Sequence, residues 1–119
     1  MSVLSIADSF YIGVLDLPAA AAWYTEKLGL QKVPLRMDDA EGCIALGFAK
    51  NDQSCITLGP RVPTDGMTAM LYAWKADKAR EALSSRGVIV GEIQKDRQGT
   101  HFFEMRDLED NRIEVSEEP

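Results

Sequence analysis

Histidine and cysteine are scarce in this sequence, and their scarcity narrows its chemistry. The 119 residues include one histidine and two cysteines. Cys43 and Cys55 are too few for the disulfide framework of a small secreted protein, so we expect two reduced thiols. The only histidine, His101, is expected to be a packed or strand-edge residue rather than a catalytic one.

Long apolar runs and an excess of positive charge are also missing. No segment approaches the ~20 consecutive apolar residues of a membrane helix. No basic residue precedes Lys27, so the basic region of a signal peptide is lacking. The net charge of −6 argues against nucleic acid and anionic membrane as partners and permits a cationic ligand. We therefore expect a cytoplasmic protein with neither partner.

The sequence does contain one pattern twice. In the first half, residues 10–14 alternate as a strand does, with Phe10, Ile12 and Val14 on one face. Asp16 then offers an N-cap and Pro18 fits the first turn of a helix. A helix ending at Gly29 is predicted, because glycine readily adopts the left-handed C-terminal cap.

The second half repeats this order. Residues 69–74 form a predicted strand, and residues 76–86 form a predicted helix that ends at Gly87. The two glycines that end the helices, Gly29 and Gly87, lie 58 residues apart. A shared offset across strand, helix and cap indicates a duplicated unit.

Further strands are expected after each helix, at 32–36, 43–48, 54–58, 88–93, 101–106 and 112–115. The predicted order is therefore βαβββ twice. We expect an α+β protein whose residues 1–119 form a single domain of two modules, about 5–60 and 66–119. The predicted link runs from Gly59 to Gly66.

Two stretches carry a resemblance to a known family. The first runs from Tyr11 to Leu17 and continues with Trp23-Tyr24 and Leu28-Gly29-Leu30. The second runs from Phe103 to Val115. Together they resemble the opening and closing motifs of the vicinal oxygen chelate superfamily. That superfamily groups glyoxalases, extradiol dioxygenases, fosfomycin-resistance enzymes and bleomycin-resistance proteins.

The resemblance implies a particular architecture. The two modules would lie side by side, with their strands curled into an incurved, mostly antiparallel sheet cup. Helices would cover the outside and the ligand would sit in the concavity. The apolar faces of residues 10–14 and 112–115 would then pack under the helices, while Glu114 would face the cup.

The resemblance also implies where a metal would be bound in metal-using relatives. The corresponding positions here are Ser9, Thr57, Thr68 and Glu114. Neutral hydroxyls are poor ligands for divalent first-row metals, which favour imidazole, thiolate and carboxylate. We therefore expect no metal and no cofactor.

Alternation and turn geometry predict what lines the cup instead. Pairing Arg106 with Arg112 across the turn places Glu104 opposite Glu114. Two acids facing one another repel, which is costly without a cation, a shared proton or water. The predicted ligand-binding residues are Tyr11, Met70, Tyr72, Trp74, Phe102, Glu104, Glu114, Thr57, Ser9 and Thr68. Two alternatives stay open: the aromatic residues fill the cup as core, or Glu104 pairs with a basic residue at the rim.

These features favour a binding protein over an enzyme. The leading hypothesis is a homodimer of the bleomycin-resistance type, which sequesters a small molecule, with a cationic aromatic drug as the favoured class. An alternative is a metal-independent isomerase or lyase, with Glu104 or Glu114 as general base and Tyr11 or Tyr72 as proton donor. A metal-dependent enzyme of the glyoxalase type is the least favoured.

Overall fold

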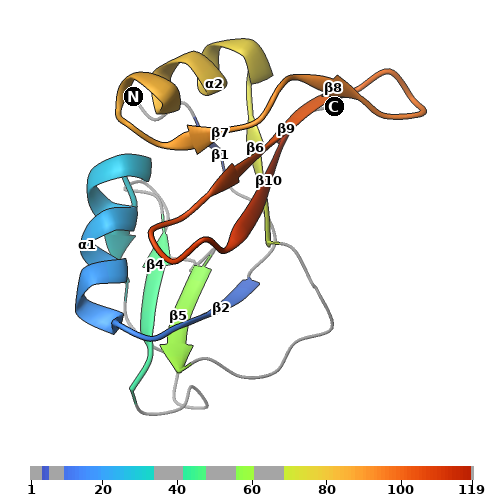
Figure 1. Cartoon of the computed structure of the whole chain (residues 1–119). Helices are drawn as coiled ribbons and strands as arrows, with labels where there is room; N and C mark the ends of the chain where they lie inside the picture. Colours follow the sequence, from blue (N-terminus) through green and yellow to red (C-terminus); the bar gives the residue numbers. More distant parts are fainter. Residues whose placement is uncertain (1–3, 6–9, 34–41, 48–55, 61–68, 119) are drawn as a thin grey trace.

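The computed structural model of the chain describes residues 4–5, 10–33, 42–47, 56–60 and 69–118. These residues form two helices and two sheets, with α2 over one sheet and α1 beside the other (Figure 1). The elements in chain order are β1 (Leu4–Ser5), β2 (Phe10–Val14), α1 (Leu17–Leu28), β3 (Gln31–Lys32), β4 (Ile44–Gly47), β5 (Ile56–Pro60), β6 (Ala69–Ala73), α2 (Ala76–Ser85), β7 (Ile89–Val90), β8 (Gln94–Lys95), β9 (His101–Arg106) and β10 (Arg112–Glu117).

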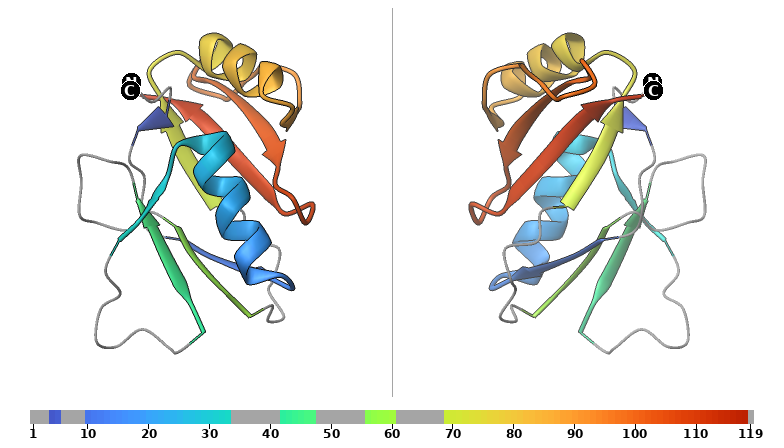
Figure 2. Two further views of the ribbon diagram at one scale, coloured as in Figure 1. Left: turned by 90° about the vertical axis from the view of Figure 1, so that its left-hand side faces the viewer. Right: turned by 90° about the vertical axis from the view of Figure 1, so that its right-hand side faces the viewer.

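The strands divide into a six-stranded and a four-stranded sheet. The six-stranded sheet has the order β1-β6-β10-β9-β7, and β8 pairs with β9. The four-stranded sheet has the order β2-β5-β4-β3. In each sheet one pair is parallel, β6 with β10 and β2 with β5, and the other pairs are antiparallel. The two sheets lie one above the other, as both views in Figure 2 show.

Helix α1 begins and ends where the sequence predicts. The side chain of Asp16 accepts a hydrogen bond from the backbone N–H of Ala19 at 3.1 Å, which caps the first turn. Gly29 ends the helix with φ 74°, a conformation that costs glycine little. The buried face carries Ala20, Ala21, Tyr24 and Leu28.

One hydrophobic core underlies both helices. The largest fully buried side chains include Leu58 of the four-stranded sheet, Phe103 and Val115 of the six-stranded sheet, and Leu83 of α2. As predicted, Ile12, Val14, Ile113 and Val115 are buried, and Phe10 packs against the core while partly exposed. Burial of such side chains is the main favourable contribution to folding.

The turn between β9 and β10 fastens the six-stranded sheet to α1. Asp107 is buried, and its Oδ2 accepts a 2.6 Å hydrogen bond from the hydroxyl of Tyr24. Its Oδ1 accepts from the backbone N–H of Glu109 at 2.9 Å and of Asn111 at 2.7 Å. The carboxylate of Glu109 in turn accepts from the N–H groups just before α1, at residues 15 and 16. Buried charge is thereby fully hydrogen-bonded.

Several predicted boundaries are wrong. Residues 88–93 do not form one strand: β7 covers two residues, the backbone N–H of Gly91 still donates to the carbonyl of Glu104 at 2.7 Å, and β8 begins at Gln94. Gly59 and Pro60 belong to β5 rather than to the link between halves. Strand β10 extends to Glu117 because it pairs along its length with β6. The parts of the predicted strands at 34–36, 48 and 54–55 lie outside the described residues.

The first strand, β1, was not predicted from the sequence. It pairs antiparallel with β6, so the start of the first half adds a strand to the sheet of the second half. Within the part of the chain that the structure describes, no helix is long and apolar enough to cross a membrane.

Candidate functional site

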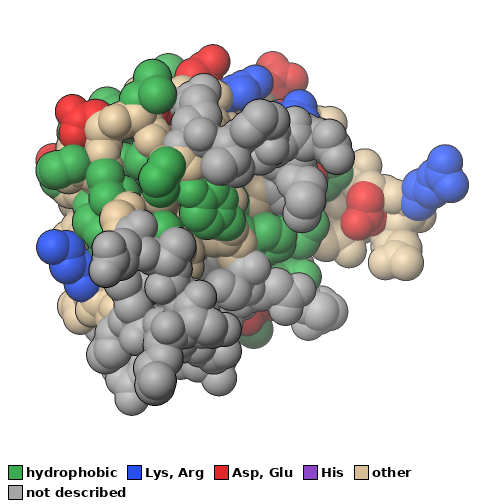
Figure 3. Space-filling model, turned by 90° about the horizontal axis from the view of Figure 1, so that it is seen from below, with side chains coloured by type: hydrophobic (Ala, Val, Ile, Leu, Met, Phe, Trp, Pro, Cys, Tyr) green, Lys and Arg blue, Asp and Glu red, His purple; other side chains and the backbone are tan. Residues whose placement is uncertain are grey.

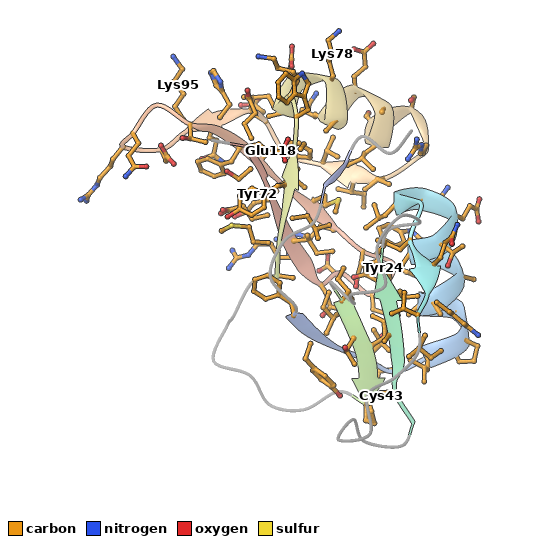
Figure 4. The ribbon with its side chains drawn as sticks, turned by 180° about the vertical axis from the view of Figure 1, so that it is seen from behind. Tyr24, Cys43, Tyr72, Lys78, Lys95 and Glu118 are labelled. Atoms are coloured by element: carbon orange, nitrogen blue, oxygen red, sulfur yellow. The ribbon has the colours of Figure 1, made fainter. Side chains whose placement is uncertain are left out.

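No helix among the described residues covers one face of the six-stranded sheet, and we call this face the open face. Side chains alternate between the two faces of a strand. The odd-numbered Leu71, Phe103 and Val115 are buried on one face, so the even-numbered residues of the same strands point to the open face. Figure 4 shows Tyr72 projecting from β6 on the side of the sheet away from α1. The partly exposed residues of the open face are Met70, Tyr72, Phe102, Glu104, Arg106, Glu114 and Ser116.

The strand register brings the predicted residues together. Glu114 pairs directly with Glu104 on one side and with Met70 on the other. Directly paired residues have Cβ atoms about 4.5–5.5 Å apart. The prediction that Arg106 pairs with Arg112 and Glu104 with Glu114 is confirmed. The two carboxylates therefore share one face of adjacent strands.

The two carboxylates have different surroundings. The carboxylate of Glu104 lies 4.0 Å from Nη1 of Arg112, and both side chains are partly exposed. This is the rim pairing that the sequence analysis left open. Glu114 has no hydrogen bond or ion pair to any described residue. The binding of a cation would be favourable next to this unpaired carboxylate beside Met70.

The next pair along the strands is aromatic. Ser116 of β10 pairs with Tyr72 on one side and with Phe102 on the other. The small serine therefore lies between two rings, one pair away from Glu114. Aromatic faces attract cations and stack on flat groups.

The four-stranded sheet carries the remaining predicted residues. Tyr11 of β2 pairs with Thr57 of β5, and Thr57 pairs with the buried Ala45 of β4. A Cβ placed on Gly59 would meet Cys43 Sγ and the Tyr11 hydroxyl, each at 2.7 Å. The ring of Tyr11 is thus seated over a glycine, beside a free thiol. Cys55 lies outside the described residues.

Tyr11 is poorly suited to donate a proton in catalysis. Its hydroxyl already donates a hydrogen bond to the carbonyl oxygen of Pro60. Burial, and then the neighbouring Cys43, raise the pKa of Tyr11 above its ordinary value. A raised pKa makes the phenol a weaker acid near neutral pH.

Trp74 stands apart from this cluster. Trp74 follows the end of β6 and is 73% exposed, with the ammonium of Lys75 6.0 Å from its ring centroid. Ser9 and Thr68 lie outside the described residues. His101 points to the opposite side of the sheet from Phe102, as predicted, and its Nδ1 lies 3.3 Å from the carboxylate of Glu117.

The donor set does not fit a divalent metal. Of the four positions that the resemblance implies, the described ones are Thr57 and Glu114, which lie in different sheets. The other two are hydroxyl side chains, at Ser9 and Thr68. One carboxylate with neutral hydroxyls is a poor site for zinc, nickel or iron. Among the residues that the structure describes, no cluster of three or more histidines, cysteines or acids could hold a metal.

Three residues of the open face, Arg106, Arg112 and Ser116, were not among the predicted site residues. Arg112 lies at the end of the face and pairs with Glu104, and Ser116 separates the two rings. Ser116 could have been found by extending the predicted pairing of β9 with β10 one residue beyond Val115, whereas Arg112 was already part of that pairing. Arg112 was treated only as a register partner, and the strand was expected to end at Val115.

The sequence matches no protein-family model and no curated protein, but its structure resembles solved ones. A glyoxalase/bleomycin resistance protein/dioxygenase superfamily member from Sphaerobacter thermophilus has a TM-score of 0.75 and 23% identity, over 96% of this chain and 98% of that chain. A lactoylglutathione lyase from Agrobacterium tumefaciens has a TM-score of 0.69 and 21% identity, over 95% of this chain and 93% of that chain. TnmS3, an antibiotic binding protein from Streptomyces sp., has a TM-score of 0.66 and 18% identity, over 97% of each chain.

Proposed function

From the vicinal oxygen chelate fold, which the chain shares with these structures, we propose that the protein binds and sequesters a small, flat, positively charged molecule on its open face. The observation that carries this proposal is Glu114, a carboxylate with no partner among the described residues, set in a row with Met70 and Glu104. Its charge has to be balanced by water or by a ligand. A cationic group would be held there by charge-assisted hydrogen bonds.

The rest of the ligand would lie on the aromatic pair. Tyr72 and Phe102 flank Ser116, so a flat ring system can reach both side chains from a position above the serine. Stacking on these rings and contact with the polarisable Met70 sulfur would supply affinity without a second charge. The remaining proposed contacts of the ligand are Tyr11, Thr57, Trp74, Ser9 and Thr68.

Glu104 takes a secondary part in this proposal. Its pairing with Arg112 already balances its charge, although an ion pair between partly exposed side chains is weak. A ligand with one cationic group is therefore favoured over a dication. This narrows the predicted class from a cationic aromatic molecule to a singly charged one.

The test is a matched pair of charge-removing variants. Glu114→Gln should weaken the binding of a flat monocation such as proflavine about 12- to 160-fold, which corresponds to about 1.5–3 kcal/mol for a hydrogen bond to a charged group. Glu81→Gln, on the exposed side of α2, removes the same charge and should leave the affinity unchanged. Calorimetric titration of both variants with proflavine and with a neutral ring system of the same shape measures the difference.

Two results would count against this proposal. Equal affinity of Glu114→Gln and the unchanged protein for every cation in a panel would leave an apolar face with an incidental carboxylate. Equal affinity for the cation and the neutral ring system would have the same meaning. A thermal-shift screen identifies candidates first, since a ligand at a hundredfold excess over Kd stabilises the folded state by about 2.7 kcal/mol.

The enzyme alternative keeps Glu114 as its strongest feature. An unpaired carboxylate on a partly apolar face could act as a general base in a metal-independent isomerase or lyase. Of the two proposed proton donors, Tyr11 is the weaker, because its hydroxyl donates to Pro60 and it lies in the other sheet, which leaves Tyr72 of the open face. Conversion of a bound compound in the presence of a chelator, lost in Glu114→Gln, would establish this alternative instead.

A further inference from the structure

A pocket of about 430 Å3 lies on the opposite side of the six-stranded sheet from the open face. Its lining residues come from the start of α2, from the segment before β8, and from β9 and β10: Lys75, Asp77, Lys78, Ile93, His101 and Glu117. His101 and Glu117 alternate with Phe102 and Ser116 along their strands, so they point to the side that α2 covers. The volume falls within the ~300–1,000 Å3 of small-molecule sites.

The two carboxylates of this pocket are already engaged. The carboxylate of Glu117 lies 3.3 Å from Nδ1 of His101, and its side chain is 19% exposed. Asp77 Oδ1 accepts a 2.9 Å hydrogen bond from the backbone N–H of Lys78. Neither carboxylate is paired with a lysine of the pocket.

The two lysines, by contrast, have no acidic partner. Among the described residues neither Lys75 nor Lys78 takes part in an ion pair. The ammonium of Lys75 lies 6.0 Å from the centroid of the Trp74 ring. Two unpaired cations therefore border one pocket in a chain whose net charge is −6.

The start of α2 adds to the positive character of the pocket. The residue at the N-cap is Lys75, whose side chain makes no capping hydrogen bond. Of the first-turn N–H groups, that of Lys78 already donates to Asp77, whereas those of Ala76 and Asp77 have no bond among the described residues. The helix dipole favours negative charge at this end. The lysines and the backbone therefore favour the same kind of ligand.

We propose that this pocket binds an oxyanion group of a small metabolite, either a phosphate or a carboxylate. Lys75 and Lys78 supply the cationic contacts, and His101, held by Glu117, adds a third charge when its imidazole is protonated. Ile93 gives an apolar wall for the uncharged part of the ligand. The site is separate from the open face, so it does not depend on the function proposed above.

The experiment uses the full chain and two defined probes. Inorganic phosphate and acetate are titrated separately while amide resonances are followed by NMR, with sodium chloride at equal ionic strength as the reference. Saturable shifts at residues 76–79 and at His101 are expected with at least one probe, without matching shifts at Tyr72 or Glu114. The probe that saturates at the lower concentration identifies the oxyanion.

Matched variants test whether the lysines carry the binding. Lys78→Gln should raise the Kd about 1.5- to fivefold, because the loss of one exposed ion pair costs about 0.2–1 kcal/mol. Lys75→Gln should act in the same direction. Lys32→Gln, on the exposed strand β3 of the other sheet, removes the same charge and should leave the Kd unchanged.

Three results would overturn the proposal. The first is shifts with phosphate and acetate that do not exceed those with chloride. The second is a Kd that rises as much in Lys32→Gln as in Lys78→Gln, which would reflect net charge rather than a site. The third is saturable binding whose shifts map to the open face instead.

Discussion

Removing one hydroxyl group should reveal how strongly the six-stranded sheet is fastened to α1. Tyr24 is fully buried, and its hydroxyl donates a 2.6 Å hydrogen bond to Asp107 of the β9–β10 turn, 83 residues further along the chain. Figure 4 shows Tyr24 on the α1 side of the molecule, among the packed side chains. The substitution Tyr24→Phe deletes this bond and keeps the ring. The change therefore probes the hydrogen bond more than the packing.

The expected loss follows from the partners that remain. A hydrogen bond to a charged group contributes about 1.5–3 kcal/mol. In the variant Asp107 keeps the side-chain amide of Asn111 at 2.9 Å and two backbone N–H groups, so the carboxylate stays largely satisfied. We therefore expect the lower part of that range, about 1.5–2 kcal/mol. For a domain of this size each kcal/mol lowers Tm by roughly 4 °C, which gives a fall of about 6–8 °C.

Chemical denaturation with urea at neutral pH measures this loss directly. The matched control is Tyr72→Phe, because Tyr72 lies partly exposed on the open face and its hydroxyl has no recorded hydrogen bond. Its free energy of unfolding should change by less than about 0.5 kcal/mol. If both substitutions have equally small effects, the Tyr24–Asp107 bond does not fasten the sheet and the reasoning fails.

The same bond predicts how stability depends on alkaline pH. Burial first, then the charge and hydrogen bond of Asp107 and the charge of Glu109, raise the pKa of Tyr24 far above its ordinary value. An unfolded tyrosine ionises near pH 10. Below that pH the contribution to stability is fully present. Above it the unfolded chain loses the proton that the folded chain keeps, so stability falls by up to about 1.4 kcal/mol per pH unit. Tyr24→Phe should show a shallower fall, and an equal slope in both proteins would contradict this.

Three further predictions use other parts of the molecule. Gly59→Ala should lower the free energy of unfolding by about 1–3 kcal/mol in urea, because the new methyl group displaces the ring of Tyr11; an unchanged stability would mean that the ring moves freely. Elemental analysis should find less than one transition metal per ten chains, since Thr57 and Glu114 do not form a suitable donor set. Sedimentation should give a homodimer rather than the 13.2 kDa monomer, because exposed apolar side chains such as Trp74 are better buried against a second copy.

The surface supports the dimer prediction in part. Seen from below, hydrophobic side chains gather near the middle of the visible face, with charged groups toward its edge (Figure 3). The exposed large apolar residues in the described part of the chain are Tyr11, Leu15, Trp74, Ile89 and Leu108. Single exposed apolar residues are normal, whereas a gathered group favours an interface.

Local chemistry made much of the fold predictable. Asp16, Pro18 and Gly29 fix the ends of α1 by capping, which depends on neighbouring residues and so can be read from sequence. The register of β9 with β10 follows from the short turn between them, and it placed Glu104 opposite Glu114 correctly. The three strands after α1 followed from the repeat, whereas four strands, β7 to β10, follow α2 where three were predicted.

The sequence predictions fail where a residue's structural partner is distant in the chain or where a strand is short. Strand β1 has two residues, too few for alternation to be detected, and it pairs with β6 almost 70 residues away. Residues 88–93 are apolar enough for one strand, but the backbone leaves the ladder after Gly91. The bond of Tyr24 to Asp107 was not predicted, because a helix pattern does not identify the acceptor of a buried hydroxyl.

The acidic turn from Asp107 to Asn111 explains why the sequence predicts the fold better than the ligand. The side chains of Asp107 and Glu109 bind backbone N–H groups and Tyr24, so they hold β9 against β10 and both against α1. These roles are structural and would be needed whatever the ligand. Glu114 stands in the strand that this turn positions, yet it has no partner among the described residues. The turn from Asp107 to Asn111 therefore sets the position of Glu114, whereas the role of Glu114 depends on a ligand that the turn does not specify.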